Sequence, residues 1–262
     1  MGDWTNGLAA MLFVMVRVSG MVVFAPFFSS SALPARSKAV FVGALSFLVV
    51  PVVATSLKSP VALKLTALLG ELAVGLVYGM VLALLNEMLL FAGEVAGLQL
   101  SFSAVNLIDP TSSIQTPLMS DLFQLMGTLV LIASGLDRIV LASLLRSFHA
   151  VPLGTYKLLP LTSGAIVQAA GGIFLAAIEL AAPILAATML VEIAVALLSR
   201  LSPQLPVMSL TVPLKTLVGF GILIGSLALW PRFIGTRFTS LLNLAERLLQ
   251  IRPDASGLGL GG

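Results

Sequence analysis

The sequence predicts an all-α integral membrane protein, and three observations support this prediction. Hydrophobic residues make up 58% of the 262 residues, whereas charged residues make up 10%, against roughly a quarter in ordinary soluble domains. The mean hydropathy is +1.10. The apolar residues form long runs rather than short segments that alternate with polar residues. A soluble enzyme, a disordered chain and an outer-membrane barrel are therefore excluded.

Six apolar stretches account for the expected helices, because a membrane-spanning helix needs about 20 mostly apolar residues. Single helices are expected within residues 8–28, 39–57, 122–145 and 216–230, and two helices each within 65–108 and 158–199. Pro26 and Pro51 lie near the ends of the first two stretches, and Asp137-Arg138 interrupts 122–145.

The breaks between these stretches contain Pro or clusters of small polar residues, which are typical of turns. Most breaks are too short to hold a separate domain. We expect one helical domain over residues 1–251 and a flexible Gly-rich tail over 252–262.

Acidic residues inside the apolar stretches do not fit helices surrounded by lipid. They are Glu71, Glu87, Glu94, Glu179 and Glu192. Each costs about 2.5 kcal/mol or more at a bilayer centre, which favours helices that face protein or a polar channel. Ion pairs with Arg are the simpler interpretation, and a carboxylate-only cation site is the alternative. Basic residues occur in nearly every break, so the positive-inside rule gives no orientation.

Residues for catalysis or cofactor binding are scarce in this chain. His149 is the single histidine and there is no Cys, which leaves too few ligands for a zinc site. No Gly-Lys phosphate loop and no Gly-x-Ser-x-Gly elbow occur. A net charge of +3 is too dilute for a nucleic-acid-binding face. We expect no catalytic, metal or cofactor-binding residues and no nucleic-acid partner.

Pairs of glycines four residues apart occur at three places: Gly75 and Gly79, Gly93 and Gly97, and Gly221 and Gly225. Such spacing lets two helices approach closely. The chain has 23 glycines, so coincidence is an alternative explanation for each pair.

The segment 106–121 breaks the helical pattern between two apolar stretches. Asp109-Pro110 and Pro117 end any helix that enters it, and the residues between them are uncharged. Its backbone groups would lack partners in lipid. The segment therefore lies in protein, in water or across a water-filled passage, with an ordinary surface loop as the alternative. A second break begins at Arg200, whose charge suits a helix C-terminus, and contains Pro203.

Four groups of residues, in order, resemble the FliR/SctT family of type III secretion export proteins. They are Arg17 with Ala25-Pro26; Ala92-Gly-Glu-Val-Ala-Gly-Leu-Gln-Leu100 followed by Asp109-Pro110 and Ser112; Phe148-His149 with Pro152-Leu-Gly154; and Arg200-x-x-Pro203-Gln204 leading to Pro213-Leu-Lys215. The resemblance covers roughly residues 8–250.

The resemblance implies a non-enzymatic channel subunit of the flagellar export gate, built of hydrophobic helical hairpins in a helical hetero-oligomer. One copy would assemble with FliP-like and FliQ-like subunits, alongside FlhA-like and FlhB-like export proteins. The core would lie in the bacterial inner membrane at the flagellar basal body, partly raised to the periplasmic side. Unfolded flagellar substrates would pass through it, and lipid would surround it.

The resemblance also suggests roles for individual residues. A gate or plug loop would comprise Ile108, Asp109, Pro110, Ile114, Pro117, Leu118 and Met119. Helix packing and assembly would involve Glu71, Gly93, Glu94, Gly97, Arg200, Pro203 and Gln204. A proton-coupled secondary transporter that uses the intramembrane Glu residues is the alternative function. A membrane-embedded hydrolase is a third class and would require His149.

Overall fold

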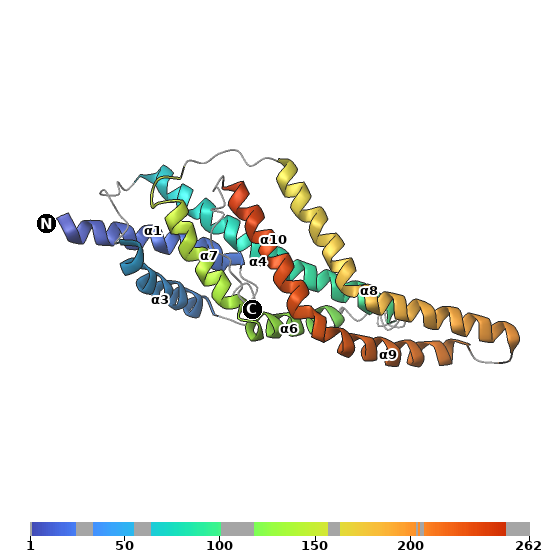
Figure 1. Ribbon diagram of the computed structural model, residues 1–262. Helices are drawn as coiled ribbons and strands as arrows, with labels where there is room; N and C mark the ends of the chain where they lie inside the picture. Colours follow the sequence, from blue (N-terminus) through green and yellow to red (C-terminus); the bar gives the residue numbers. More distant parts are fainter. Residues whose placement is uncertain are drawn as a thin grey trace, which may run out of the picture. The chain divides into compact units, whose positions relative to one another are not determined.

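The computed structural model describes residues 2–24, 34–54, 64–100, 118–156, 163–202, 204 and 207–249. Within these residues the chain consists of helices joined by short turns, which confirms the predicted all-α class. Figure 1 shows the order of the helices along the chain. They are α1 (Gly2–Phe24), α3 (Ala35–Ala54), α4 (Leu65–Gln99), α6 (Leu118–Ala133), α7 (Leu136–Ala150), α8 (Ser163–Leu201), α9 (Val207–Ser226) and α10 (Trp230–Leu248), with the short 3-10 helix η1 (Leu227–Leu229) before α10.

Two helices each were predicted within residues 65–108 and 158–199. Each of these stretches instead contains one long helix, so this part of the prediction was wrong. Residues 65–99 form α4, which contains no Pro. Residues 163–201 form α8, which contains Pro183 and bends along its length (Figure 1). A proline kinks a helix by removing one hydrogen bond, but the helix continues beyond it.

The other boundaries differ from the prediction by smaller amounts. The break between α6 and α7 lies at Ser134-Gly135, just before Asp137, and Gly135 has a φ of 68°. Glycine adopts this left-handed conformation readily at a helix C-terminus. α9 begins at residue 207 and includes Pro213, so the break before it is shorter than expected.

The sequence analysis did not anticipate α10. Its buried residues include Ile234, Phe238, Leu242 and Ala245, spaced three or four apart. Its polar and charged residues lie between them, which is the pattern of an amphipathic helix. No continuous apolar run lies within α10 itself, although the longer stretch Ser209–Leu248, which joins α9 to α10, has the length and hydropathy of a membrane span.

The chain divides into two compact units. Residues 1–84, 137–169 and 238–262 form unit 1, and residues 85–136 and 170–237 form unit 2. The single domain expected over residues 1–251 stays a prediction. The tail at 252–262 lies outside the described residues.

Unit 1 contains α1, α3, the first part of α4, α7 and the end of α10. α3 packs against α1. The core of the unit includes Phe13 and Val14 of α1, Val74 of α4 and Phe238 of α10, each almost fully buried.

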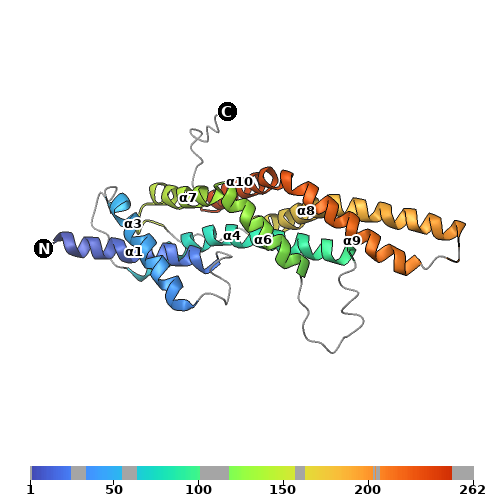
Figure 2. The ribbon, with the colours of Figure 1, turned by 90° about the horizontal axis from the view of Figure 1, so that it is seen from below.

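Unit 2 contains the second part of α4, α6, most of α8, and α9. Its core includes Phe123 of α6 and Trp230 at the start of α10, whose rings lie 5.1 Å apart. Phe91 of α4 and Phe174 of α8 meet edge to face at 5.0 Å. α8 and α9 lie side by side as a hairpin in both views (Figure 1, Figure 2).

Four helical segments among the described residues are long and apolar enough to cross a membrane: Ala35–Val53, Leu65–Gln99, Gly171–Leu201 and Ser209–Leu248. This finding agrees with the predicted membrane protein.

Candidate functional site

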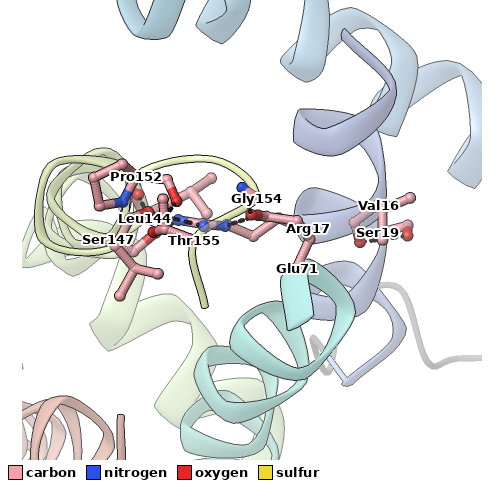
Figure 3. Close-up of polar contacts among 10 residues, drawn as sticks. Val16, Arg17, Ser19, Glu71, Leu144, Ser147, Pro152, Gly154 and Thr155 are labelled. Atoms are coloured by element: carbon pink, nitrogen blue, oxygen red, sulfur yellow. Dashed lines mark hydrogen bonds and ion pairs between the residues drawn. The ribbon is translucent and has the colours of Figure 1, made fainter. Parts of the chain in front are cut away.

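A buried polar cluster in unit 1 is centred on Arg17 of α1 (Figure 3). Its Nε donates to the Glu71 carboxylate of α4 at 2.6 Å. Its two terminal nitrogens donate to the Ser147 hydroxyl at 3.2 Å and to the Val151 carbonyl at 3.0 Å. One guanidinium therefore joins α1 to α4 and to the C-terminal end of α7.

The Glu71 carboxylate has a partner for each of its oxygens. Oε2 accepts from Arg17, and Oε1 accepts from the backbone N–H of Gly154 at 2.8 Å. Gly154 lies in the turn that follows α7 and has a φ of 74°, which a side chain would disfavour. Glu71 therefore holds this turn against α4.

Neither charge of this ion pair is exposed to solvent: both side chains have a relative exposure of 0%. Removing two charges from water is expensive, and a buried pair needs further hydrogen bonds to offset that cost. Here the donors of Arg17 and both oxygens of Glu71 have partners. The guanidinium also lies 4.3 Å from the centre of the Phe148 ring, where a cation–π attraction adds to the stabilisation.

Glycines allow the backbones around this cluster to approach closely. A Cβ on Gly75 of α4 would clash with the carbonyl oxygen of Arg17, and one on Gly20 of α1 would lie 3.0 Å from the Leu72 carbonyl. A Cβ on Gly70 would lie 2.7 Å from the carbonyl of Tyr156. Burial raises the pKa of the Tyr156 phenol above its ordinary value.

Unit 2 has its own close contacts along α4. A Cβ on Gly93 would lie 2.6 Å from the Met119 carbonyl and from the Cα of Ser120, both in α6. A Cβ on Gly97 would lie 3.1 Å from the Met119 Cβ. A Cβ on Gly219 of α9 would clash with the Leu100 side chain. These contacts position the chain on both sides of residues 101–117.

The hairpin of α8 and α9 exposes many large apolar side chains. They include Phe174, Leu175, Met189, Leu190, Ile193, Leu197 and Leu201 of α8, and Leu210, Leu217 and Ile224 of α9. Two ion pairs lie on the same unit: Glu192 with Lys215, and Glu179 with Arg237. Both glutamates are more than a third exposed. An exposed apolar surface of this extent is typical of a binding surface.

The predicted gate residues fall mostly outside the part of the chain that the structure describes. Five of them lie outside the described residues: Ile108, Asp109, Pro110, Ile114 and Pro117. Leu118 is exposed at the start of α6, whereas Met119 is buried against α4. Their role in a gate stays a prediction.

The predicted assembly residues are dispersed over the molecule. Glu71 is in the buried cluster, and Gly93 and Gly97 contact α6. Glu94 is exposed on α4, and Arg200 and Gln204 are exposed at and beyond the end of α8. Pro203 lies outside the described residues. A role in assembly stays a prediction for all of them.

Three of the five glutamates in apolar stretches are paired with a basic residue. Glu71 and Glu179 pair with Arg, as the simpler interpretation predicted, and Glu192 pairs with Lys215. Glu87 and Glu94 are exposed on α4. Within the described residues, no three His, Asp or Glu side chains lie close enough to hold a metal ion. The Nδ1 of His149 lies 3.1 Å from the carbonyl of Leu145 in its own helix.

Sequence reasoning did not identify the partners of the buried cluster. Glu71 stands out in the sequence as a charge within an apolar stretch, and Arg17 and Gly154 belong to the motifs that resemble the FliR/SctT family, but nothing in the sequence links the three. Ser147 carries no signal that distinguishes it from other small residues. Opposite charges in two separate apolar stretches were the available clue, because each requires a partner.

The sequence was also compared with known proteins. The family described as "Bacterial export proteins, family 1" matches residues 8–241. The chain belongs to this family. The match covers most of the protein and includes both the buried cluster and the α8–α9 hairpin.

Proteins named "Flagellar biosynthetic protein FliR" are similar to this chain over nearly its whole length. The Escherichia coli (strain K12) protein is 24% identical over 96% of this chain and 97% of its own length. The Aquifex aeolicus protein is 26% identical over 93% and 95%. The Bacillus subtilis protein is 27% identical over 82% and 85%. The resemblance to the FliR/SctT family is thus confirmed.

Proposed function

We propose that this chain is a structural channel subunit of the flagellar type III protein export apparatus. Family membership and the names of its relatives support a role in flagellar protein export. In this proposal the chain performs no catalysis. It assembles in the bacterial inner membrane with FliP-like and FliQ-like subunits, close to FlhA-like and FlhB-like proteins. Unfolded substrates pass through the assembled core.

The observation that supports assembly is the exposed surface of the α8–α9 hairpin. Leu190 and Leu217 are 67% and 73% exposed in the single chain. Yet the same hairpin carries Glu192, which is 46% exposed. Lipid would cover the apolar side chains but not a half-exposed carboxylate. Partner subunits can cover both, because they supply apolar contacts and polar groups together.

Helix length also favours a protein environment for the long helices. α8 has 39 residues and α4 has 35. At about 1.5 Å per residue, both are far longer than the roughly 30 Å of hydrocarbon in a bilayer. Helices of this length extend beyond the membrane, which is compatible with the raised core that the family resemblance implies.

The gate role of residues 108–119 is part of the same proposal. It is supported by the FliR-like order of motifs and by the two prolines of the segment. Leu100 and Met119, which border residues 101–117, are both buried in unit 2. Such anchoring would hold a plug at both ends.

The test is co-expression with FliP-like and FliQ-like subunits, followed by native mass spectrometry of the purified complex. We expect a hetero-oligomer with one copy of this chain, and aggregation or degradation of the chain expressed alone. A well-behaved monomer or homodimer would contradict the proposal and favour the transporter alternative. A hydrolase would lose an activity when His149 is replaced.

A matched pair of variants tests which surface binds the partners. Leu217→Glu places a charge on the exposed apolar face of α9, and Ser240→Glu places one on the polar face of α10, where Ser240 is exposed. We expect the first variant to lower the yield of the complex and the second to leave it unchanged. Equal yields would show that the α8–α9 surface does not contact a partner.

A further inference from the structure

The helix α3 differs from the other long apolar helices in having an outer face without polar groups. After Lys38, the remaining 16 residues of α3 contain one polar side chain, Ser46. Ser46 is fully buried, and its hydroxyl donates to the Val42 carbonyl of its own helix at 2.7 Å. The side of α3 that faces away from α1 therefore presents only hydrocarbon.

The exposed part of α3 is broad. Val40, Phe47 and Leu48 are between 70% and 74% exposed. Val42, Val49 and Val53 form a narrow buried stripe together with Ser46. Spacings of three and four residues put this stripe on one side of the helix, and Val40, Phe47 and Leu48 lie outside it.

The contrast with the α8–α9 hairpin indicates what covers α3. The hairpin carries two partly exposed glutamates, Glu179 and Glu192, among its apolar side chains, which suits a protein partner. The most exposed side chains of α3, Val40, Phe47 and Leu48, are hydrocarbon and carry no charge or hydrogen-bonding group by which a protein partner would be selected. Acyl chains require no such groups.

Basic residues lie at one end of α3. Arg36 and Lys38 occupy its first turn, and no acidic residue accompanies them there. The positive end of the helix dipole makes this turn an unfavourable place for a cation. Arg36 is exposed. Cations at the end of a lipid-facing helix attract anionic headgroups.

We propose that the outer face of α3, defined by Val40, Phe47 and Leu48, is a lipid-facing surface that contacts phospholipid acyl chains, with Arg36 at the level of anionic headgroups. The 16 residues of α3 that follow Lys38 span about 24 Å, which is most of the roughly 30 Å of hydrocarbon in a bilayer. Pro51 is compatible with this environment, since Pro is more frequent in membrane-spanning helices than in soluble ones. This inference rests on the membrane location given in the proposed function.

A spin-label scan tests the proposal, and the absence of Cys in the chain makes single-Cys variants straightforward. Val40, Phe47 and Leu48 are replaced one at a time on the outer face, and Val42 and Val49 on the inner stripe. The full chain is assembled with its partner subunits and reconstituted into phosphatidylglycerol–phosphatidylethanolamine vesicles. Collisions of the label with oxygen and with a water-soluble nickel chelate are then measured, and an unsubstituted complex corrects for labelling of the partners.

We expect oxygen collisions to exceed nickel collisions several-fold at the three outer positions and both to be low at the inner ones. Leu190→Cys on α8 is the matched control, because Leu190 is 67% exposed in the single chain. Both collision rates should be low there. A low rate of oxygen collisions at the outer positions would show that protein covers α3. A high rate of nickel collisions would show that this face is exposed to water. Either result overturns the proposal.

The headgroup contact has its own test. Arg36→Gln should lower the preference of the complex for spin-labelled phosphatidylglycerol over phosphatidylcholine by about fivefold, whereas Arg232→Gln, at another exposed arginine, should leave it unchanged. An unchanged preference in Arg36→Gln would overturn the headgroup assignment. If the complex forms and α3 is covered by protein, this inference fails while the proposed function stands. If no complex forms but the chain alone shows the lipid pattern in membranes, the proposed function fails and the inference stands.

Discussion

Both units of the molecule have charged residues within apolar stretches of sequence, but the charged side chains differ in how deeply they are buried. In unit 1, Arg17 and Glu71 are completely buried and their polar atoms have partners within the chain. In unit 2, Glu192 and Glu179 pair with Lys215 and Arg237 while remaining more than a third exposed. The Arg17–Glu71 pair of unit 1 thus has its partners within the chain, whereas unit 2 leaves the carboxylates of Glu179 and Glu192 partly exposed at its surface.

This difference indicates what each ion pair contributes. A buried pair becomes strongly destabilising when one member is lost, because the other charge stays in the interior. An exposed pair contributes about 0–1 kcal/mol in water. The cluster in unit 1 is therefore expected to support the fold of the chain, and the pairs in unit 2 are expected to act in assembly.

The largest effect is expected from Glu71→Ala. Loss of the carboxylate leaves the Arg17 guanidinium and the Gly154 N–H without their acceptor, at a cost of about 3–5 kcal/mol. The measurement is the thermal midpoint of the purified complex, together with the amount of chain in membranes. Glu87→Ala is the control, since Glu87 is exposed on the same helix, and its effect should stay within about 0.5 kcal/mol. Equal stability of the two variants would contradict a structural role for the cluster.

The next largest effect is expected from Gly93→Ala. Its Cβ would lie 2.6 Å from the backbone of Met119 and Ser120, and such overpacking costs about 1–3 kcal/mol. Gly97→Leu should also impair complex formation. Gly221→Ala is the control, because nothing lies within 4 Å of its added Cβ and Ala favours a helix over Gly by up to about 1 kcal/mol.

Thermal midpoints and complex yields distinguish these glycine variants. A normal yield for Gly97→Leu would show that its spacing with Gly93 is coincidental. A loss of yield in Gly221→Leu without loss of chain stability would place Gly221 at a partner surface.

A smaller effect on stability is expected from the Glu179–Arg237 pair of unit 2, whose side chains are 40% and 34% exposed. Glu179→Lys should change chain stability by no more than about 1 kcal/mol but should reduce the yield of the complex. The reciprocal exchange, Glu179→Lys with Arg237→Glu, should recover part of that yield if pairing matters. A stability loss as large as that of Glu71→Ala would remove the distinction between the two units.

The smallest effect on stability is expected from shortening the segment between Thr111 and Thr116. Residues 101–117 lie outside the described helices, so complex yield should stay normal. The proposed gate role predicts that small molecules then leak through the membrane. Permeability at the wild-type level, with normal assembly, would identify an ordinary loop and place the gate elsewhere.

The sequence by itself determined the class of this protein and most of its helices. Long apolar runs are incompatible with a surface exposed to water. The charged pair Asp137-Arg138 interrupts one such run, and the break between α6 and α7 lies just before it, at Ser134-Gly135. The family resemblance was also visible in the order of short motifs, and its confirmation came from the match over residues 8–241.

The tertiary structure alone decided how long the helices are and which charges meet. A hairpin and one long helix have the same apolar composition, so α4 and α8 could not be recognised as single helices. α10 lacked an apolar run because its hydrophobic residues are spaced for one face only. Arg17 and Glu71 lie 54 positions apart in the sequence. Their pairing follows from the crossing of α1 and α4 at Gly20 and Gly75, a contact between distant segments that no local pattern specifies.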